Sequence, residues 1–172
     1  DELGFEIETL GEEVRCKGRC CGGTVTLPYP SVGATENLIM AALGGRHDTI
    51  IKNCATEPEI VDFASFLKTC GFQVHGAGSD TIFIKGGECL HRQDTMYFIM
   101  EDRIEAATYM MAVAGTGGKA TFRNIRPEVL KSVINVLERM GTSIKSYENI
   151  MEVSAPRKLK SPGFVVTQPY PG

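Results

Sequence analysis

Short β-branched segments alternate with apolar segments along the chain, and this alternation predicts strands and helices in turn. A strand at 23–27 is followed by an almost wholly apolar run at 38–43, which predicts a helix from about residue 34 that is buried on every side. Gly44 and Gly45 then end this helix. A second all-round apolar helix is expected at 109–114, after a turn at 100–108.

The remaining segments predict two amphipathic helices and several short strands. Thr56 and Glu59 have the spacing of a capping box and Pro58 would lie in the first turn, so a helix is expected after Thr56 that runs to about residue 70. Pro127 opens the second amphipathic helix. Strands are expected at 3–7, 13–17, 49–52, 72–75, 81–85, 96–99 and 120–123, near residue 144 and at 150–153.

These elements form an internal repeat. Asn53 and Asn124 lie 71 positions apart, and the pair Ala34-Thr35 matches the pair at 107–108 with a separation of 73. Parts of further copies occur at both ends, because residues 3–5 resemble 70–72 and residues 169–171 resemble 28–30. A βαβαββ unit of about 70 residues therefore occurs twice. The pattern predicts an α/β (α+β) piece of a longer repeat protein, truncated at both ends.

Composition narrows the possible partners. The 172 residues are 42% hydrophobic and 23% charged, as in a globular protein of one or two domains. The net charge of -3 does not favour a nucleic-acid partner, no apolar run reaches the length of a membrane span, and no signal peptide is recognised. Reduced structural thiols are expected, with a metal or redox role as alternatives, at Cys16, Cys20, Cys21, Cys54, Cys70 and Cys89.

The turn at residues 28–35 is the best candidate for an anion site. It leads from a predicted strand into a helix, and Ser31-Val32-Gly33 offers backbone N–H groups, a hydroxyl and a residue without a side chain. A helix start also carries the positive end of the helix dipole. A plain turn before a capped helix is the alternative, and the residues by themselves leave both open.

Other candidate motifs favour structural interpretations. Residues 115–120 resemble a phosphate-binding loop only faintly, because Ala120 stands where a hydroxyl is needed and a helix precedes the segment. Residues 76–80 lie between strands and predict a hairpin turn rather than a dinucleotide site. Acidic residues at the predicted helix starts stabilise the dipole, and Arg103 beside Asp102 is expected to form an ion pair.

Four ordered motifs resemble the bacterial UDP-N-acetylglucosamine enolpyruvyl transferase family along nearly the whole chain. They are residues 31–35, 53–62, 76–82 and 102–108. The resemblance implies six repeats, three in each domain, with each domain an inside-out α/β barrel that has helices inside and sheets outside. Residues 1–100 would then hold the end of one repeat and one full βαβαββ repeat of the first domain. Residues 101–172 would hold the first repeat of the second domain and the opening strand of the next.

The resemblance also implies a reaction. Enolpyruvate would move from phosphoenolpyruvate to the 3-hydroxyl of UDP-N-acetylglucosamine in the first committed step of peptidoglycan synthesis, in the cytoplasm and without a metal or organic cofactor. No nucleic-acid or membrane partner is implied. A non-catalytic repeat module that binds a nucleotide-sugar or a protein is the alternative. Tyr29, which stands where some family members have Lys, suggests altered substrate choice as a third hypothesis.

By position, four residues match the family's contacts to the UDP-sugar, chiefly through the backbone near the diphosphate: Pro30, Ser31, Val32 and Gly33. Glu57, Asp102 and Arg103 match cleft-facing positions, the last two where the chain crosses between domains. The catalytic Lys-Asn pair, Cys and Arg of the family precede the matched part, and a catalytic Asp and a phosphoenolpyruvate-binding Arg follow it. No catalytic residue is therefore assigned. The chain alone is expected to be inactive and to form homo-oligomers through exposed helix faces.

Overall fold

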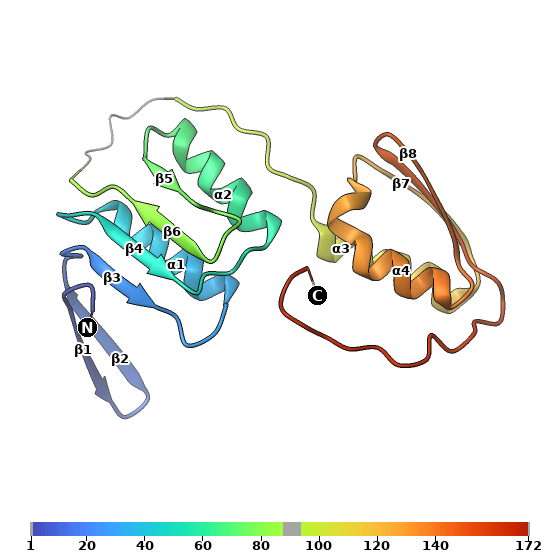
Figure 1. Cartoon of the computed structure of the whole chain (residues 1–172), viewed down its shortest axis with the longest axis horizontal. Helices are drawn as coiled ribbons and strands as arrows, with labels where there is room; N and C mark the ends of the chain where they lie inside the picture. The colour runs from blue at the N-terminus through green and yellow to red at the C-terminus, as the bar shows by residue number, and fades with distance from the viewer. Residues whose placement is uncertain (1, 88–93, 172) are drawn as a thin grey trace. The chain divides into compact units, whose positions relative to one another are not determined.

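The computed structural model describes residues 2–87 and 94–171, which form two compact units, 1–99 and 100–172 (Figure 1). Each unit combines strands with two α-helices, in an α/β arrangement. The sheets of the described residues do not close into a barrel. The fold class is thus confirmed at the level of α/β units, while the inside-out barrel stays a prediction.

Unit 1 contains a hairpin and a mixed four-stranded sheet whose helices pack against one face (Figure 1). Its sheet has the order β3-β4-β6-β5, in which β3 runs parallel to β4 and the other neighbours are antiparallel. The hairpin pairs β1 with β2. The elements are β1 (Phe5–Leu10), β2 (Glu13–Gly18), β3 (Gly23–Thr26), α1 (Val32–Leu43), β4 (Thr49–Lys52), α2 (Pro58–Thr69), β5 (Val74–His75) and β6 (Thr81–Ile84).

Unit 2 repeats part of this arrangement. Its antiparallel sheet has the order β7-β9-β8, which corresponds to β4-β6-β5 of unit 1. A strand equivalent to β3 is not formed by the described residues of unit 2. The elements are α3 (Arg103–Thr116), β7 (Lys119–Arg123), the 3-10 helix η1 (Pro127–Leu130), α4 (Lys131–Arg139), β8 (Ser143–Tyr147) and β9 (Ile150–Ser154).

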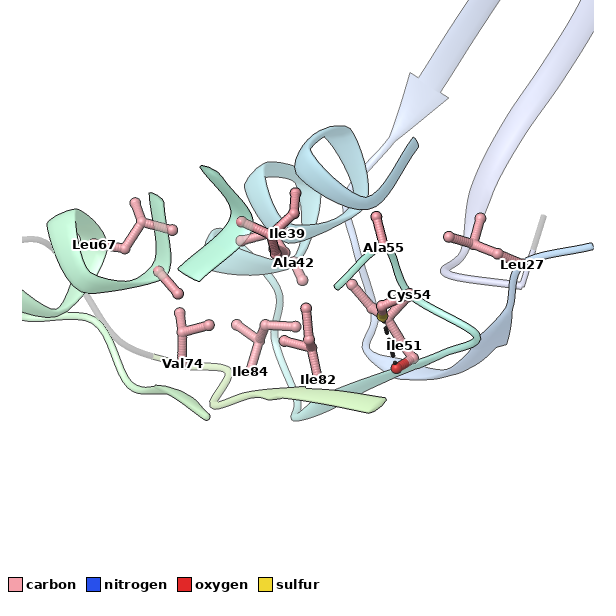
Figure 2. Close-up of a cluster of buried hydrophobic side chains, with 12 residues drawn as sticks. Leu27, Ile39, Ala42, Ile51, Cys54, Ala55, Leu67, Val74, Ile82 and Ile84 are labelled. Carbon is pink, nitrogen blue, oxygen red and sulfur yellow. Dashed lines mark hydrogen bonds between the residues drawn. The ribbon is translucent and has the colours of Figure 1, made fainter. Parts of the chain in front are cut away.

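The core of each unit lies between its helices and its sheet. In unit 1, Ile39 of α1, Ile51 of β4 and Ile82 of β6 are fully buried in one cluster (Figure 2). In unit 2, Met110 of α3 and Met151 of β9 are fully buried in the equivalent places. The apolar positions at a spacing of two in the strands and of three or four in the helices therefore meet as the sequence pattern predicts.

The structure confirms the repeat and corrects its register. The two capping residues Ser31 and Asp102 lie 71 positions apart, as do the buried Ile39 and Met110. The separation of 73 assigned to the helix starts was wrong by two residues. Asn53 and Asn124 share the left-handed conformation, with φ of 56° and 57°, because an amide side chain tolerates that turn better than most.

Both apolar helices begin earlier than predicted. A capping side chain places the start of α1 at Val32 and that of α3 at Arg103, so residues 103–108 are helix and not turn. Neither helix is buried on every side, because Met40 is 51% and Met111 is 52% exposed. These faces are the kind that the predicted homo-oligomer needs, but oligomerisation itself stays a prediction.

Three further expectations were wrong. Thr56 does not cap α2, whose N-cap is Glu57 without a side-chain hydrogen bond, since Pro58 already fills the first helical position. Residues 96–99 form no strand. The opening strand of the next repeat, expected within residues 101–172, stays a prediction. The first strand runs over Phe5–Leu10 rather than 3–7, because β1 takes its register from pairing with β2.

We predict that Ile82→Ala lowers the free energy of unfolding by about 3 kcal/mol, because it empties a fully buried site between β6 and the helices. Chemical denaturation of the whole chain measures this change. Ile7→Ala is the matched control, since Ile7 is 52% exposed and its truncation should cost under about 1 kcal/mol. Equal losses for the two variants would contradict the assigned core.

Candidate functional site

Two turns meet at one edge of the sheet of unit 1. The strands β3 and β4 are parallel, so the turns that follow them, 27–31 and 53–57, both leave from the carboxyl ends of their strands. Ligands of open α/β sheets bind outside these ends. Ser31, at the end of the first turn, and Glu57, at the end of the second, therefore lie at the same edge, which is the candidate site.

The first turn ends in a capped helix start. Ser31 is extended, with φ of -130° and ψ of 123°, and its Oγ accepts a hydrogen bond from the N–H of Ala34 at 3.3 Å. Its carbonyl oxygen accepts one from the N–H of Thr35 at 2.9 Å. The amides of Val32 and Gly33 precede the first possible helical hydrogen bond, so they are available to a ligand at the positive end of α1.

Gly33 leaves this helix start open. A Cβ atom built on Gly33 would meet no heavy atom within 4 Å, and the residue has no left-handed φ that would demand glycine. Neither backbone conformation nor packing inside the protein therefore requires glycine here. Pro30 and Tyr29 are exposed beside it, Tyr29 at 67%. The surface in front of the amides can thus admit a ligand.

Hydrogen bonds tie both ends of the first turn to the second. The N–H of Leu27 donates to the carbonyl oxygen of Lys52 at 3.0 Å, and the Asn53 side-chain amide donates to the carbonyl oxygen of Leu27 at 2.8 Å. On the helix side, the N–H of Ala55 donates to Oγ1 of Thr35 at 3.0 Å. These roles of Asn53 and Thr35 were not predicted from the sequence. The available signal was that Thr35 is the one hydroxyl residue of α1.

Glu57, expected to face a cleft, is half-buried and is the N-cap of α2. It follows the buried Ala55 by two residues, so its turn is joined to the start of α1 through Thr35. The structure thus brings the segment of Glu57 to the same edge as Ser31, Val32 and Gly33. Whether Glu57 contacts a ligand stays a prediction.

Asp102 and Arg103 belong to unit 2 and form a different helix start. The Asp102 carboxylate accepts hydrogen bonds from the N–H groups of Ile104, at 2.8 Å, and Glu105, at 3.0 Å. The Arg103 guanidinium lies over the Tyr170 ring, 5.1 Å from its centroid. Asp102 is therefore engaged as a cap. The cleft-facing role of both residues stays a prediction.

An ion pair that the sequence analysis missed adjoins this helix start. Glu101 Oε1 accepts hydrogen bonds from Nε of Arg126 at 2.5 Å and from the backbone N–H of Arg126 at 3.1 Å. Burial alone would raise the pKa of Glu101, but the hydrogen bonds and the charge of Arg126 outweigh it and hold the pKa below its ordinary value. The pair joins the segment before α3 to the turn after β7.

The five described cysteines are free thiols, as expected, while Cys89 lies outside the described residues. Cys54 is buried and its Sγ donates to the carbonyl oxygen of Ile51 at 3.2 Å (Figure 2). Burial raises the pKa of Cys54 to about 11, so it stays protonated and unreactive at neutral pH. Within 2–87 and 94–171, no three His, Cys, Asp or Glu side chains are grouped to hold a metal ion.

A search of the helices in the described part of the chain finds none with the length and apolar character that a membrane crossing requires.

Comparison with known sequences places the chain among carboxyvinyltransferases. Residues 1–171 match the family described as EPSP synthase (3-phosphoshikimate 1-carboxyvinyltransferase). A UDP-N-acetylglucosamine 1-carboxyvinyltransferase 2 of Caldanaerobacter subterraneus subsp. tengcongensis is 41% identical over 172 residues, which are 99% of this chain and 41% of that protein. A UDP-N-acetylglucosamine 1-carboxyvinyltransferase 1 of Symbiobacterium thermophilum is 45% identical, over 100% of this chain and 39% of that protein. The chain thus spans about two fifths of the length of these relatives.

Solved structures share the fold. The enolpyruvyl transferase NikO from Streptomyces tendae matches with a TM-score of 0.75 at 21% identity, over 92% of this chain and 41% of that one. EPSP synthase from Acinetobacter baumannii matches with a TM-score of 0.59 at 22% identity, over 91% of this chain and 37% of that one. At these identities the likeness shows the fold alone.

We predict that Glu101→Gln lowers the free energy of unfolding by about 1 kcal/mol at pH 7, because it removes the charge of a partly exposed hydrogen-bonded pair. Folding lowers the pKa of Glu101, so its stabilisation is complete above the ordinary value of 4.5 and disappears as the pH falls through the lower folded pKa. The stability difference between the variant and the wild type should therefore vanish in acid.

Denaturation of both proteins between pH 7 and pH 3 measures this dependence. Glu12→Gln, in the exposed turn between β1 and β2, is the matched control and should change stability by less than about 0.5 kcal/mol at every pH. A loss of the same size at pH 7 and pH 3 would contradict the ionised state of Glu101.

Proposed function

The chain belongs to the EPSP synthase (3-phosphoshikimate 1-carboxyvinyltransferase) family, and we propose that it is part of an enolpyruvyl transferase whose acceptor is UDP-N-acetylglucosamine. The choice of acceptor rests on relatives that carry this substrate in their names and are 41% and 45% identical over almost all of the chain. The donor is phosphoenolpyruvate and the product belongs to peptidoglycan synthesis, so the protein works in the cytoplasm. Those assignments come from the resemblance.

The proposal rests on the open helix start at Ser31-Val32-Gly33. Two backbone N–H groups at the positive end of α1 suit a diphosphate, since they donate hydrogen bonds without adding a charged side chain that would need its own partner. Pro30 and Ser31 border the same surface, and Gly33 keeps it clear. In this role the residues bind and orient the nucleotide-sugar, and no proton transfer is assigned to them.

We predict that Gly33→Ala weakens binding of UDP-N-acetylglucosamine at least about fivefold, because a Cβ would enter the space in front of the amides where the diphosphate lies. The fold should tolerate the change, since alanine favours a helix by up to about 1 kcal/mol over glycine. Isothermal titration of the whole chain with the nucleotide-sugar measures the dissociation constant.

Gly115→Ala is the matched control. Gly115 lies in the last turn of α3, and a Cβ there would also meet nothing within 4 Å, so this variant makes the same Gly-to-Ala change in a helix that the proposal does not use. It should bind the nucleotide-sugar as the wild type does. Equal affinity of Gly33→Ala and wild type would reject the turn as the diphosphate contact.

We predict no turnover by the 172 residues alone. The residues to which the resemblance assigns proton transfer and phosphoenolpyruvate binding are not among those matched here, and an enolpyruvyl transfer needs both charge stabilisation and a positioned acid. Phosphate release from phosphoenolpyruvate in the presence of UDP-N-acetylglucosamine should stay at the uncatalysed rate. Measurable release would mean that catalytic groups lie within the chain.

A further inference from the structure

We propose that Thr35 is a positioning residue for the nucleotide-sugar turn. Its buried hydroxyl fixes the start of α1 to the β4–α2 turn and thereby sets the direction of the Val32 and Gly33 amides. This inference rests on the proposed function, which gives those amides to the diphosphate. It adds to that function the group that holds the amides in place.

The contact is buried on both sides. Thr35 and Ala55 are each fully buried, and the N–H of Ala55 donates to Oγ1 of Thr35 at 3.0 Å. A buried backbone N–H without a partner is strongly disfavoured, so this bond persists as long as the unit is folded. Thr35 lies three residues after Val32, in the first turn of α1. The bond therefore holds the end of the helix from which the free amides project.

A second hydrogen bond fixes the other end of the turn. The side-chain amide of Asn53 donates to the carbonyl oxygen of Leu27, the first residue of the turn. Asn53 can do so because its left-handed backbone, with φ of 56°, turns the chain directly after β4. Both hydrogen bonds are donated by residues within 53–55, while Tyr29, in the middle of the turn, is 67% exposed. The ends of the turn are thus fixed and its middle faces solvent.

The second repeat shows that the fold does not need this hydroxyl. With the register of 71, Ala106 stands in the place of Thr35 and Arg126 in the place of Ala55. The N–H of Arg126 donates to Glu101 instead, so the same backbone group takes its acceptor from the segment before the helix. The hydroxyl of Thr35 links helix to turn in unit 1, which is the copy whose helix start has open amides. This difference favours a role in the site over a role in the repeat fold.

The test compares Thr35→Val, which keeps the shape and removes the acceptor, with Thr35→Ser, which keeps the acceptor. In Thr35→Val we expect the Ala55 amide to exchange at least about tenfold faster and the Val32 and Gly33 amide NMR shifts to move. The dissociation constant for UDP-N-acetylglucosamine should rise at least about fivefold. Thr35→Ser should return all three values to within about twofold of the wild type.

Thr108→Val is the matched control, because it makes the same change on α3, where the Thr108 hydroxyl is exposed and donates only within its helix, to Ile104. It should leave all three measurements unchanged. Should Thr35→Val fail to fold, Thr35→Ala, the residue that unit 2 carries at this place, replaces it.

Two results would overturn the proposal. One is Val32 and Gly33 shifts that stay unchanged when the hydroxyl is removed. The other is a Thr35→Ser variant that behaves like Thr35→Val, which would assign the effect to packing of the methyl group. Absence of binding by the wild-type chain would instead count against the proposed function, and the amide shifts would still decide whether Thr35 fixes the turn.

Discussion

The geometry of the candidate site depends on how one buried backbone N–H, that of Ala55, finds an acceptor. The β4–α2 turn contacts the start of α1 at fully buried residues, so the turn and the helix must satisfy each other's polar groups. Oγ1 of Thr35 does this at 3.0 Å. Because Thr35 lies in the first turn of α1, the same bond that completes the core also fixes where the helix dipole points. Stability and the orientation of the free amides are therefore coupled.

The sequence predicted the elements whose signals are local. The amphipathic spacing around Pro58 and the apolar strand at Thr49–Lys52 need only their own residues to be recognised, and both elements are present. Helix starts were less predictable, because the apolar run begins several residues after the capping side chain and the capped turn is itself polar. Residues 96–99 are strand-like in composition, but Tyr97 donates to the Asp62 carboxylate at 2.9 Å and packs against Phe66. A contact between residues 35 positions apart leaves no local pattern.

The position of the candidate site could be predicted from the sequence, but the hydrogen bonds that hold its turns together could not. Ser31-Val32-Gly33 has a local signature, a hydroxyl and a glycine between a strand and a helix, and the structure places it at a helix start as expected. The bonds of Thr35 and of Asn53 join residues 20 and 26 positions apart. Glu101 and Arg126 are 25 positions apart and pair only because the segment before α3 passes the turn after β7. Such partners follow from the register of the repeat, which the sequence pattern placed two residues out at the helix starts.

The two helix starts differ in ways that favour an anion at one of them and disfavour it at the other. Both begin at the same place in the repeat, but the cap is neutral Ser31 in unit 1 and the carboxylate of Asp102 in unit 2. A carboxylate cap uses the helix dipole for itself and repels a second anion, whereas a hydroxyl cap leaves the positive end uncompensated. A second difference also disfavours an anion in unit 2, since Ile104 occupies the place of Gly33 and its side chain is 58% exposed. One fold thus has an open helix start in the first repeat and a helix start closed by its own carboxylate in the second, through two differences at the same place in the repeat.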